Sequence, residues 1–332
     1  MATLNELSTL ETPRGQDLLA WMLRWSPFFR WMEERSAFFL AATKFDRYPD
    51  AGTGQLQSRG IGGGYTGNAQ TPPDRQSGEL GFVGDSLPID RSHVVDHQRG
   101  LRPIGSWFDS RFQNLAKSWV RLAEKEFMIG TGAKTGSERR PEGLLTMIDG
   151  VNNVAPWAST LTIDAVDFLD TNPNSLDLSI AAHQEAYMEA MEQILPNFED
   201  PGIMNNRQLA AKLGTMARER KRFGETFDSF GNRVETLDGI PILRLNDGSI
   251  PNDFDDNAGT ANQNTTKQII ASPGQGSYEI RTHGLEMEDE FDQILEDVRS
   301  GQIEWEFRAE NAIEDRLAVW VIRNIKVPQG SE

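Results

Sequence analysis

A 25-residue run with helical spacing constrains the fold of this chain more than any other feature. Residues 106–130 read SWFDSRFQNLAKSWVRLAEKEFMIG. Seven apolar residues of this run keep helical spacing, and they are Phe112, Leu115, Ala116, Trp119, Leu122, Ala123 and Phe127. Gly130 ends the pattern, as glycine commonly does after a helix. At ~1.5 Å per residue the helix would be roughly 35 Å long, enough to form the backbone of a whole domain.

The second half of the chain mixes helix and strand signals. We expect helices at 180–195 and 206–222, and strands around 240–243, at 302–308 and at 317–327. The segment 302–308 reads QIEWEFR, and its strict alternation of apolar and charged residues is typical of an antiparallel strand with one buried face. Residues 317–327 begin apolar on both faces, as a central strand does. The sequence therefore predicts an α+β fold.

The N-terminal segment 16–42 is rich in aromatic residues and is predicted to be helical, with a break at Ser26-Pro27. Its aromatic residues include Trp21, Trp25, Phe28, Phe29 and Trp31. Two interpretations stand side by side: an ordinary buried helix, or an arm that buries its aromatics against a neighbouring subunit. A helix lying on a membrane surface is a third and less favoured alternative, because the polar face rich in Lys and Arg that it needs is absent. Charged residues and a proline interrupt the apolar run, so no stretch approaches the ~20 residues of a membrane span. With no signal-peptide pattern at the N-terminus, we expect a soluble protein.

Residues 46–104 are dominated by Gly, Pro, Ser, Asp and Gln, with short segments of strand-forming sequence. A structureless loop of this length is unusual in a compact domain, so we expect a long two-stranded hairpin that projects from the body. Within it, GIGGGYTG (60–67) satisfies the G-x-G-x-x-G spacing of a dinucleotide loop. The polar residues before it and Pro72-Pro73 after it exclude the strand and helix that such a loop requires.

No other motif predicts chemistry. The run GTGAKTGS (130–137) lacks the glycine that precedes the lysine of a phosphate-binding loop and follows a helix instead of a strand. His93 and His97 lie in an extended pattern that separates them by ~13 Å, while His183 and His283 are isolated. The chain has no cysteine and no nucleophile signature. We therefore expect no catalytic, cofactor-binding or metal site, and favour binding or assembly over enzymatic activity.

Charge is unevenly distributed along the chain. The net charge is −17, which argues against a protein whose main task is to grip nucleic acid. Residues 281–315 carry twelve acidic residues against three basic, whereas 205–222 carry six basic against one acidic. The basic end of the second segment contains Arg218, Arg220, Lys221 and Arg222. These four residues either complement the dipole at a helix C-terminus or form an interaction surface, and opposite-signed faces can attract copies of the same chain.

The order of these parts, together with local phrases, resembles the tailed-phage major capsid proteins of the Hong Kong 97 type. FMIGTGAKTGSERRPEGLL (127–145) is similar to that family's segment after its long helix. GIMNNRQLAAKLGTMARERKRFGE (202–225), followed by LDGIPILRLND (237–247), is similar to its Asn-started helix and later Gly-x-Pro strand. The resemblance covers essentially the whole chain and depends on the sequence of elements more than on any single phrase.

The resemblance implies a division of the chain into four parts. It gives an N-terminal arm (1–45), an extended loop that overlaps the neighbouring subunit (46–104), a peripheral domain (105–150 with 286–332) and an axial domain (151–285). The glycine-rich loop would be mobile in the free protein and ordered in the shell. Candidate subunit-interface residues are Trp21, Trp25, Phe28, Phe29, Trp31, Gly62, Gly63, Gly64, Tyr65, Arg218, Arg220, Lys221 and Arg222.

The resemblance also implies partners. The chain would assemble with itself into hexamers and pentamers of an icosahedral head that encloses double-stranded DNA without reading its sequence, with a portal and a separate scaffolding protein. A decoration protein is a further candidate partner. Assembly would take place in the host cytoplasm and the product would be the virion capsid. The alternatives are an encapsulin-like compartment, or an α/β binding protein or enzyme that uses 151–285.

Two departures from the family pattern lead to specific expectations. No lysine lies between Lys44 and Lys117, so we expect no covalent cross-link of the loop-lysine type that some shells of this family form. The N-terminus lacks the long charged helical extension of capsid proteins that carry their own scaffold, which is why the scaffolding protein is expected to be separate.

Overall fold

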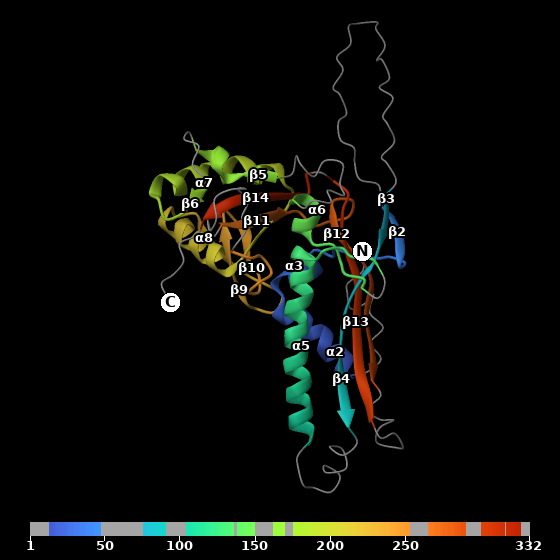
Figure 1. Ribbon diagram of the computed structural model, residues 1–332. Helices are drawn as coiled ribbons and strands as arrows, with labels where there is room; N and C mark the ends of the chain where they lie inside the picture. Colours follow the sequence, from blue (N-terminus) through green and yellow to red (C-terminus); the bar gives the residue numbers. More distant parts are fainter. Residues whose placement is uncertain are drawn as a thin grey trace, which may run out of the picture.

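The computed structural model describes residues 13–47, 76–90, 104–135, 138–149, 162–169, 175–252, 265–289, 300–315 and 317–326. These residues form two bodies (Figure 1). One is an elongated slab, built from a long helix beside a long sheet. The other is a lobe in which helices pack on a second sheet.

Six α-helices and two 3₁₀ helices lie within the described residues. They are α2 (Pro13–Trp25), α3 (Pro27–Glu34), α5 (Ile104–Ile129), α6 (Leu144–Asp149), η2 (Ala165–Phe168), α7 (Ala181–Ile194), η3 (Leu195–Asn197) and α8 (Arg207–Glu219). The break predicted at Ser26-Pro27 is confirmed, because the Ser26 side chain accepts a hydrogen bond from the Phe29 N–H and caps α3. Asn206 caps α8 in the same way, by accepting from the Leu209 N–H.

The slab sheet has the strand order β1-β12-β13-β4. Its strands are β1 (Phe38–Leu40), β4 (Gly81–Asp90), β12 (Tyr278–Asp289) and β13 (Ser300–Ile313). β13 pairs antiparallel with β12 on one side and with β4 on the other, while the short β1 joins β12 in parallel. On one face of this sheet α5 contacts β4 and α2 contacts both α5 and β12.

The lobe sheet has the order β5-β14-β11-β7-β10-β9-β8, with β6 also pairing with β14. Its strands are β5 (Thr162–Asp164), β6 (Leu176–Asp177), β7 (Gly202–Asn205), β8 (Phe223–Phe227), β9 (Arg233–Leu237), β10 (Ile240–Arg244), β11 (Thr265–Ala271) and β14 (Val319–Lys326). Strands from distant parts of the chain therefore lie side by side in this sheet. A separate antiparallel pair, β2 (Lys44–Arg47) with β3 (Gln76–Glu79), lies beside the slab.

The buried apolar residues form two clusters. One fills the slab and continues onto a face of the lobe sheet, where it includes Met204, Ile269 and Val321, and the other lies within the lobe. In the slab, rings from three elements meet: Phe29 of α3, Phe127 of α5 and Phe307 of β13, with centroids 5.3 to 5.8 Å apart. Such aromatic clusters bury a large apolar area in favourable ring geometries. The N-terminal helices are thus a structural layer of the slab.

Several expectations from the sequence are confirmed. The long helix, the helices near 180–195 and 206–222 and the three strands are all present at or within a few residues of the predicted positions. Residues 38–40 were expected to be helical and instead form β1, because backbone pairing with β12 places them in the slab sheet. No helix among the described residues is long and apolar enough to cross a membrane.

The region 46–104 is only partly described, and the glycine run 60–67 lies outside the described residues. The β2–β3 pair fits the expected hairpin at its base. β4 does not project, because it pairs with β13 along its whole length. The implied division of domains also differs from the topology at the C-terminus, since β14 is hydrogen-bonded into the lobe sheet and not into the slab.

Candidate functional site

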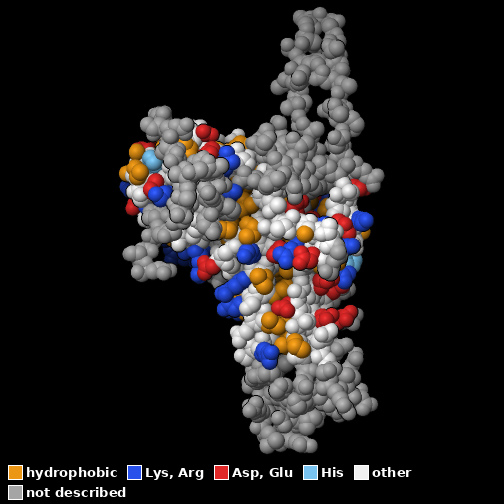
Figure 2. Space-filling model, in the orientation of Figure 1, with side chains coloured by type: hydrophobic (Ala, Val, Ile, Leu, Met, Phe, Trp, Pro, Cys, Tyr) orange, Lys and Arg blue, Asp and Glu red, His pale blue; other side chains and the backbone are white. Residues whose placement is uncertain are grey.

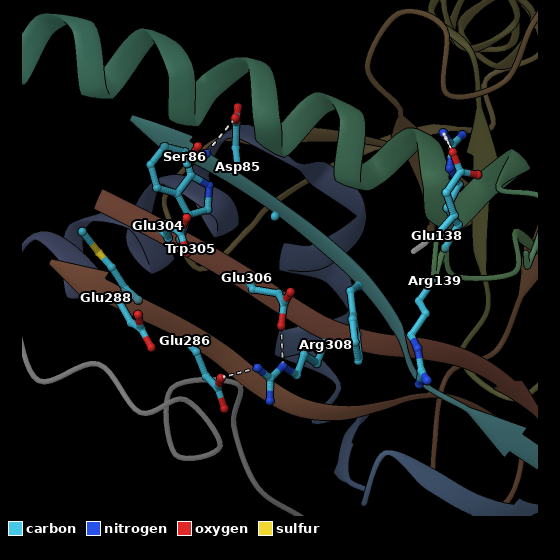
Figure 3. A pocket seen from close by; sticks show the side chains of 14 residues that line it. Asp85, Ser86, Glu138, Arg139, Glu286, Glu288, Glu304, Trp305, Glu306 and Arg308 are labelled. Atoms are coloured by element: carbon cyan, nitrogen blue, oxygen red, sulfur yellow. Dashed lines mark hydrogen bonds and ion pairs between the residues drawn. The ribbon is translucent and has the colours of Figure 1, made fainter. Parts of the chain in front are cut away.

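The face of the slab sheet that the helices leave uncovered is the candidate functional surface. Along β13 the side chains of Ile303, Trp305 and Phe307 are buried toward the helices, as the alternation in the sequence predicts. The intervening residues point the opposite way and line a concavity of about 580 Å³ (Figure 3). Four of the twelve acidic residues noted in 281–315 line this concavity.

Four glutamates stand in two facing pairs on this surface. The register between β12 and β13 places Glu286 directly across from Glu306, and Glu288 directly across from Glu304. Paired positions in an antiparallel sheet present their side chains on the same face at close range, and like charges there are destabilising. We refer to these four residues as the glutamate face.

Arg308 neutralises one end of the glutamate face. Its guanidinium lies 2.5 Å from Glu306 and 3.1 Å from Glu286 (Figure 3). The hydrogen bond to Glu306, together with the nearby carboxylates, raises the pKa of Arg308 above its ordinary value. Among the described residues no cation pairs with Glu288 or Glu304 at the other end. The negative charge of the surface is therefore concentrated at that end.

Glu310, two residues beyond Arg308 on β13, has a buried carboxyl group. Glu310 is 4% exposed; it accepts a hydrogen bond from the Glu142 N–H at 2.5 Å and pairs with Lys134. Burial raises the pKa of Glu310 to about 7, and the charge of Lys134 opposes that rise. Lys134 belongs to the run 130–137 that partly resembles a phosphate-binding loop. Its ammonium group pairs with Glu310 and so links the segment after α5 to the slab sheet.

The surface offers four carboxylates and the Arg308 guanidinium on paired strands, an arrangement suited to charged contacts. No group of three or more His, Asp or Glu side chains among the described residues is arranged to hold a metal ion. His183 accepts a hydrogen bond from the Asp177 N–H at 3.0 Å, and His283 lies 3.7 Å from Glu286. His93 and His97 lie outside the described residues.

The structure separates the aromatic interface candidates into two groups. Phe28, Phe29 and Trp31 are at most 2% exposed inside the chain's own core, which leaves them no surface for a neighbouring subunit. For these three the buried-helix interpretation is the one that fits. Trp21 and Trp25 remain partly exposed and stack with centroids 5.5 Å apart.

The basic candidates at the end of α8 are largely paired within the chain. Arg218 lies 2.5 Å from Glu235, and Arg222 pairs with Glu192 and Asp238. Arg220 lies 4.0 Å from Glu185, and Lys221 is exposed with a φ of 59°. Gly62, Gly63, Gly64 and Tyr65 lie outside the described residues.

Sequence reasoning missed one carboxyl that organises the slab. Glu124 is fully buried inside α5 and accepts hydrogen bonds from Ser26 Oγ, the Asn246 N–H and Ser249 Oγ. Burial is the main influence on its pKa, which is raised. The available signal was its position, since Glu124 lies between Val120 and Phe127 on the apolar side of the helix.

Comparisons with known proteins show which structures share this fold. No protein-family model and no curated protein matches the sequence. Solved structures do match: the SrpI encapsulin of Synechococcus elongatus PCC 7942 shares 13% identity over 91% of this chain and 90% of its own, with a TM-score of 0.52. The capsid of the native GTA particle shares 17% identity over 89% of each chain, with a TM-score of 0.51. The capsid of cyanophage A-1(L) shares 12% identity over 90% of this chain and 93% of its own, with a TM-score of 0.50.

Each of these structures is a shell protein, and each likeness extends over about nine-tenths of both chains. The chain therefore has the Hong Kong 97-type capsid fold.

Proposed function

We propose that this chain is the major capsid protein of a tailed bacteriophage, which self-assembles into hexamers and pentamers of an icosahedral head around double-stranded DNA. The observation that carries the proposal is the match of nearly the whole chain to proteins that build closed shells. A structural role without catalysis follows from that function. The virion is then its location, after assembly in the host cytoplasm.

Assembly gives the remaining interface candidates a role. The part of the loop 46–104 that contains Gly62, Gly63, Gly64 and Tyr65 would lie on a neighbouring subunit, whereas β4 pairs with β13 of its own chain. Trp21 and Trp25, which are partly exposed, and the basic residues Arg220 and Lys221 are the other described candidates for contacts between subunits. A portal and a separate scaffolding protein complete the expected partners, and a decoration protein is a further candidate partner.

Electron microscopy of the purified full chain tests the proposal. After expression alone, negative-stain images should show rings, pentamers, hexamers or shells. Shells formed without a scaffolding protein should vary in size, so uniform particles would contradict the separate scaffold. Monodisperse monomers or dimers at every concentration would contradict assembly altogether.

An encapsulin-like compartment is a second candidate, because the SrpI encapsulin is among the structures that match over about nine-tenths of both chains. The contents of particles from infected or induced cells distinguish the two functions. Nuclease-resistant double-stranded DNA supports the phage capsid. Particles that hold a protein cargo and no protected DNA would support the compartment.

A further inference from the structure

Between residues 110 and 125, the exposed side chains of α5 include cations and no anion. Between residues 110 and 125 nine residues of this helix are exposed. Four are cationic, four are neutral and polar, and one is apolar: Arg111, Lys117, Arg121 and Lys125; Ser110, Gln113, Asn114 and Ser118; and Leu122. An exposed helix usually mixes both signs, so a face with four cations and no anion is notable.

No carboxylate among the described residues forms an ion pair with Lys117, Arg121 or Lys125 on this face. Glu124 points into the core, and Glu126 lies 3.7 Å from Arg140. Within the described part of the chain, Lys117, Arg121 and Lys125 form no ion pair, although Lys117 sits over the ring of Trp25 at 5.9 Å. Their charges are therefore available to a partner outside the chain.

The slab consequently has two faces of opposite sign. The glutamate face lies on one side of the sheet, and α5 covers the other side. In Figure 2 basic side chains lie over the long helix, and acidic side chains gather over the edge of the sheet. If the chain forms a wall around DNA, as proposed above, one of these two faces lies toward the phosphates.

We propose that the exposed side of α5 is a weak, sequence-independent contact surface for the phosphate backbone of enclosed double-stranded DNA. The four cations extend from Arg111 to Lys125, which is roughly 21 Å along the helix. A duplex presents about twelve phosphates over that length. The glutamate face then points away from the DNA.

The composition of the α5 face favours a polyanion over a protein partner. A protein interface needs apolar anchors at its centre, and Leu122 is the one large apolar side chain among the nine exposed residues. The total charge of −17 keeps the contact weak, because the rest of the molecule repels phosphates.

Binding of a short duplex to the unassembled full chain tests the surface directly. The test variant replaces Arg111, Lys117, Arg121 and Lys125 with Gln, and the control replaces Arg207, Lys212, Arg220 and Lys221 with Gln. Both variants lose the same charge, so overall repulsion changes equally. Thermal melts establish that both are folded.

Wild type and control should bind the duplex at low salt. The affinity of the α5 variant for the duplex should be lower by on the order of tenfold or more. The slope of log K against log salt should also fall by roughly 3 in the α5 variant, about 0.9 for each phosphate that Lys117, Arg121 and Lys125 no longer neutralise. No duplex binding by wild type, or equal losses in both variants, would overturn the proposal. Binding of poly-glutamate without binding of the duplex would also overturn the proposal and would indicate an acidic protein partner.

Cysteine labelling of assembled particles tests the orientation of the slab. The chain has no cysteine, so Leu122→Cys and Ser86→Cys each introduce a single thiol, on the α5 face and on the opposite sheet face respectively. A maleimide too large to enter the shell should leave Leu122→Cys unlabelled until the particles are dissociated, and should label Ser86→Cys in intact particles. Labelling of Leu122→Cys in intact shells would contradict the inference. If the chain forms no rings, pentamers, hexamers or shells, the proposed function fails, while the duplex assay still reports on the surface itself.

Discussion

Ser26 Oγ lies 2.5 Å from Oε2 of Glu124 and donates a hydrogen bond to it, and neither side chain is exposed to solvent. The other carboxylate oxygen accepts from the Asn246 N–H at 2.6 Å and from Ser249 Oγ at 3.0 Å. One carboxyl thereby joins the cap of α3, the interior of α5 and the turn that follows β10. It connects the slab to the lobe at a point that water does not reach.

Removing this carboxyl should destabilise the protein strongly. Glu124→Ala leaves two hydroxyl groups and a backbone N–H buried without their acceptor, and it also leaves a cavity. We expect the free energy of unfolding in urea to fall by about 2 to 4 kcal/mol. Glu124→Gln keeps one acceptor oxygen for Asn246 and Ser249 and can donate to Ser26, so it should stay much closer to wild type.

Lys125→Ala is the matched control, because it removes an exposed side chain from the next position of the same helix. Surface changes of this kind are usually within about 0.5 kcal/mol of wild type. A loss in Lys125→Ala as large as that in Glu124→Ala would contradict the role assigned to the buried carboxyl.

The stability of the protein should fall as pH rises toward neutrality, and Glu310 should account for part of that fall. Its pKa is about 7 in the folded chain against an ordinary value of 4.5, chiefly through burial. The folded state therefore holds this proton more tightly than the unfolded state does. The resulting stabilisation is complete below about pH 4.5 and is lost as the pH rises through about 7.

Urea unfolding at pH 5 and at pH 8.5, for wild type and Glu310→Gln, measures this contribution. The shift corresponds to an upper figure of about 3 kcal/mol for one group. Glu310→Gln should therefore show a shallower decline than wild type, while Glu279, whose pKa is also raised to about 7, continues to act in both proteins. Identical pH profiles would show that Glu310 does not titrate in this range.

The sequence predicts those parts of the fold whose signal is local. The alternation in 302–308 correctly gives the buried and exposed faces of β13, because a strand repeats every two residues regardless of its partner. The long helix is found for the same reason, since its apolar stripe repeats with the helical period.

Features that depend on distant pairing could not be predicted. The three residues of β1 are strand only because they lie beside β12, more than two hundred residues later in the chain. The facing glutamates depend on the register between β12 and β13, which composition does not specify. The acidic segment was visible as a charge imbalance, but its arrangement in opposed pairs was not.

Gly143 should not tolerate a side chain. A Cβ atom at this position would lie 2.5 Å from the backbone nitrogens of Ile129 and Gly130, at the end of α5. Because backbone atoms cannot rotate out of the way, Gly143→Ala should lower the free energy of unfolding by about 2 kcal/mol or more. Gly274→Ala is the control: its nearest neighbour would be Ser277 Oγ at 3.7 Å, and it should be neutral or slightly stabilising.

Mature particles should dissociate completely into single chains in denaturing gels. The loop-lysine cross-link of some Hong Kong 97-type shells needs a lysine in the extended loop, and none lies between Lys44 and Lys117. SDS electrophoresis of particles should therefore give the single-chain band of this protein and no ladder of multiples. A ladder that survives boiling and reductant would show that other residues form covalent links.

The facing pair of Glu288 and Glu304 should be a site where charge reversal stabilises the chain. These carboxylates stand directly opposite each other on β12 and β13, and the described residues supply them no pairing cation. Glu288→Lys converts a repulsion into an attraction, a change of about 0.5 to 1 kcal/mol for cross-strand pairs. The gain should appear in thermal melts at low salt and vanish near 1 M NaCl, where the screening length is about 3 Å. Glu304→Lys should behave alike, whereas the double variant Glu288→Lys/Glu304→Lys should lose the gain, because two lysines again face each other. A double variant as stable as either single one would contradict the register and the pairing on which the glutamate face depends.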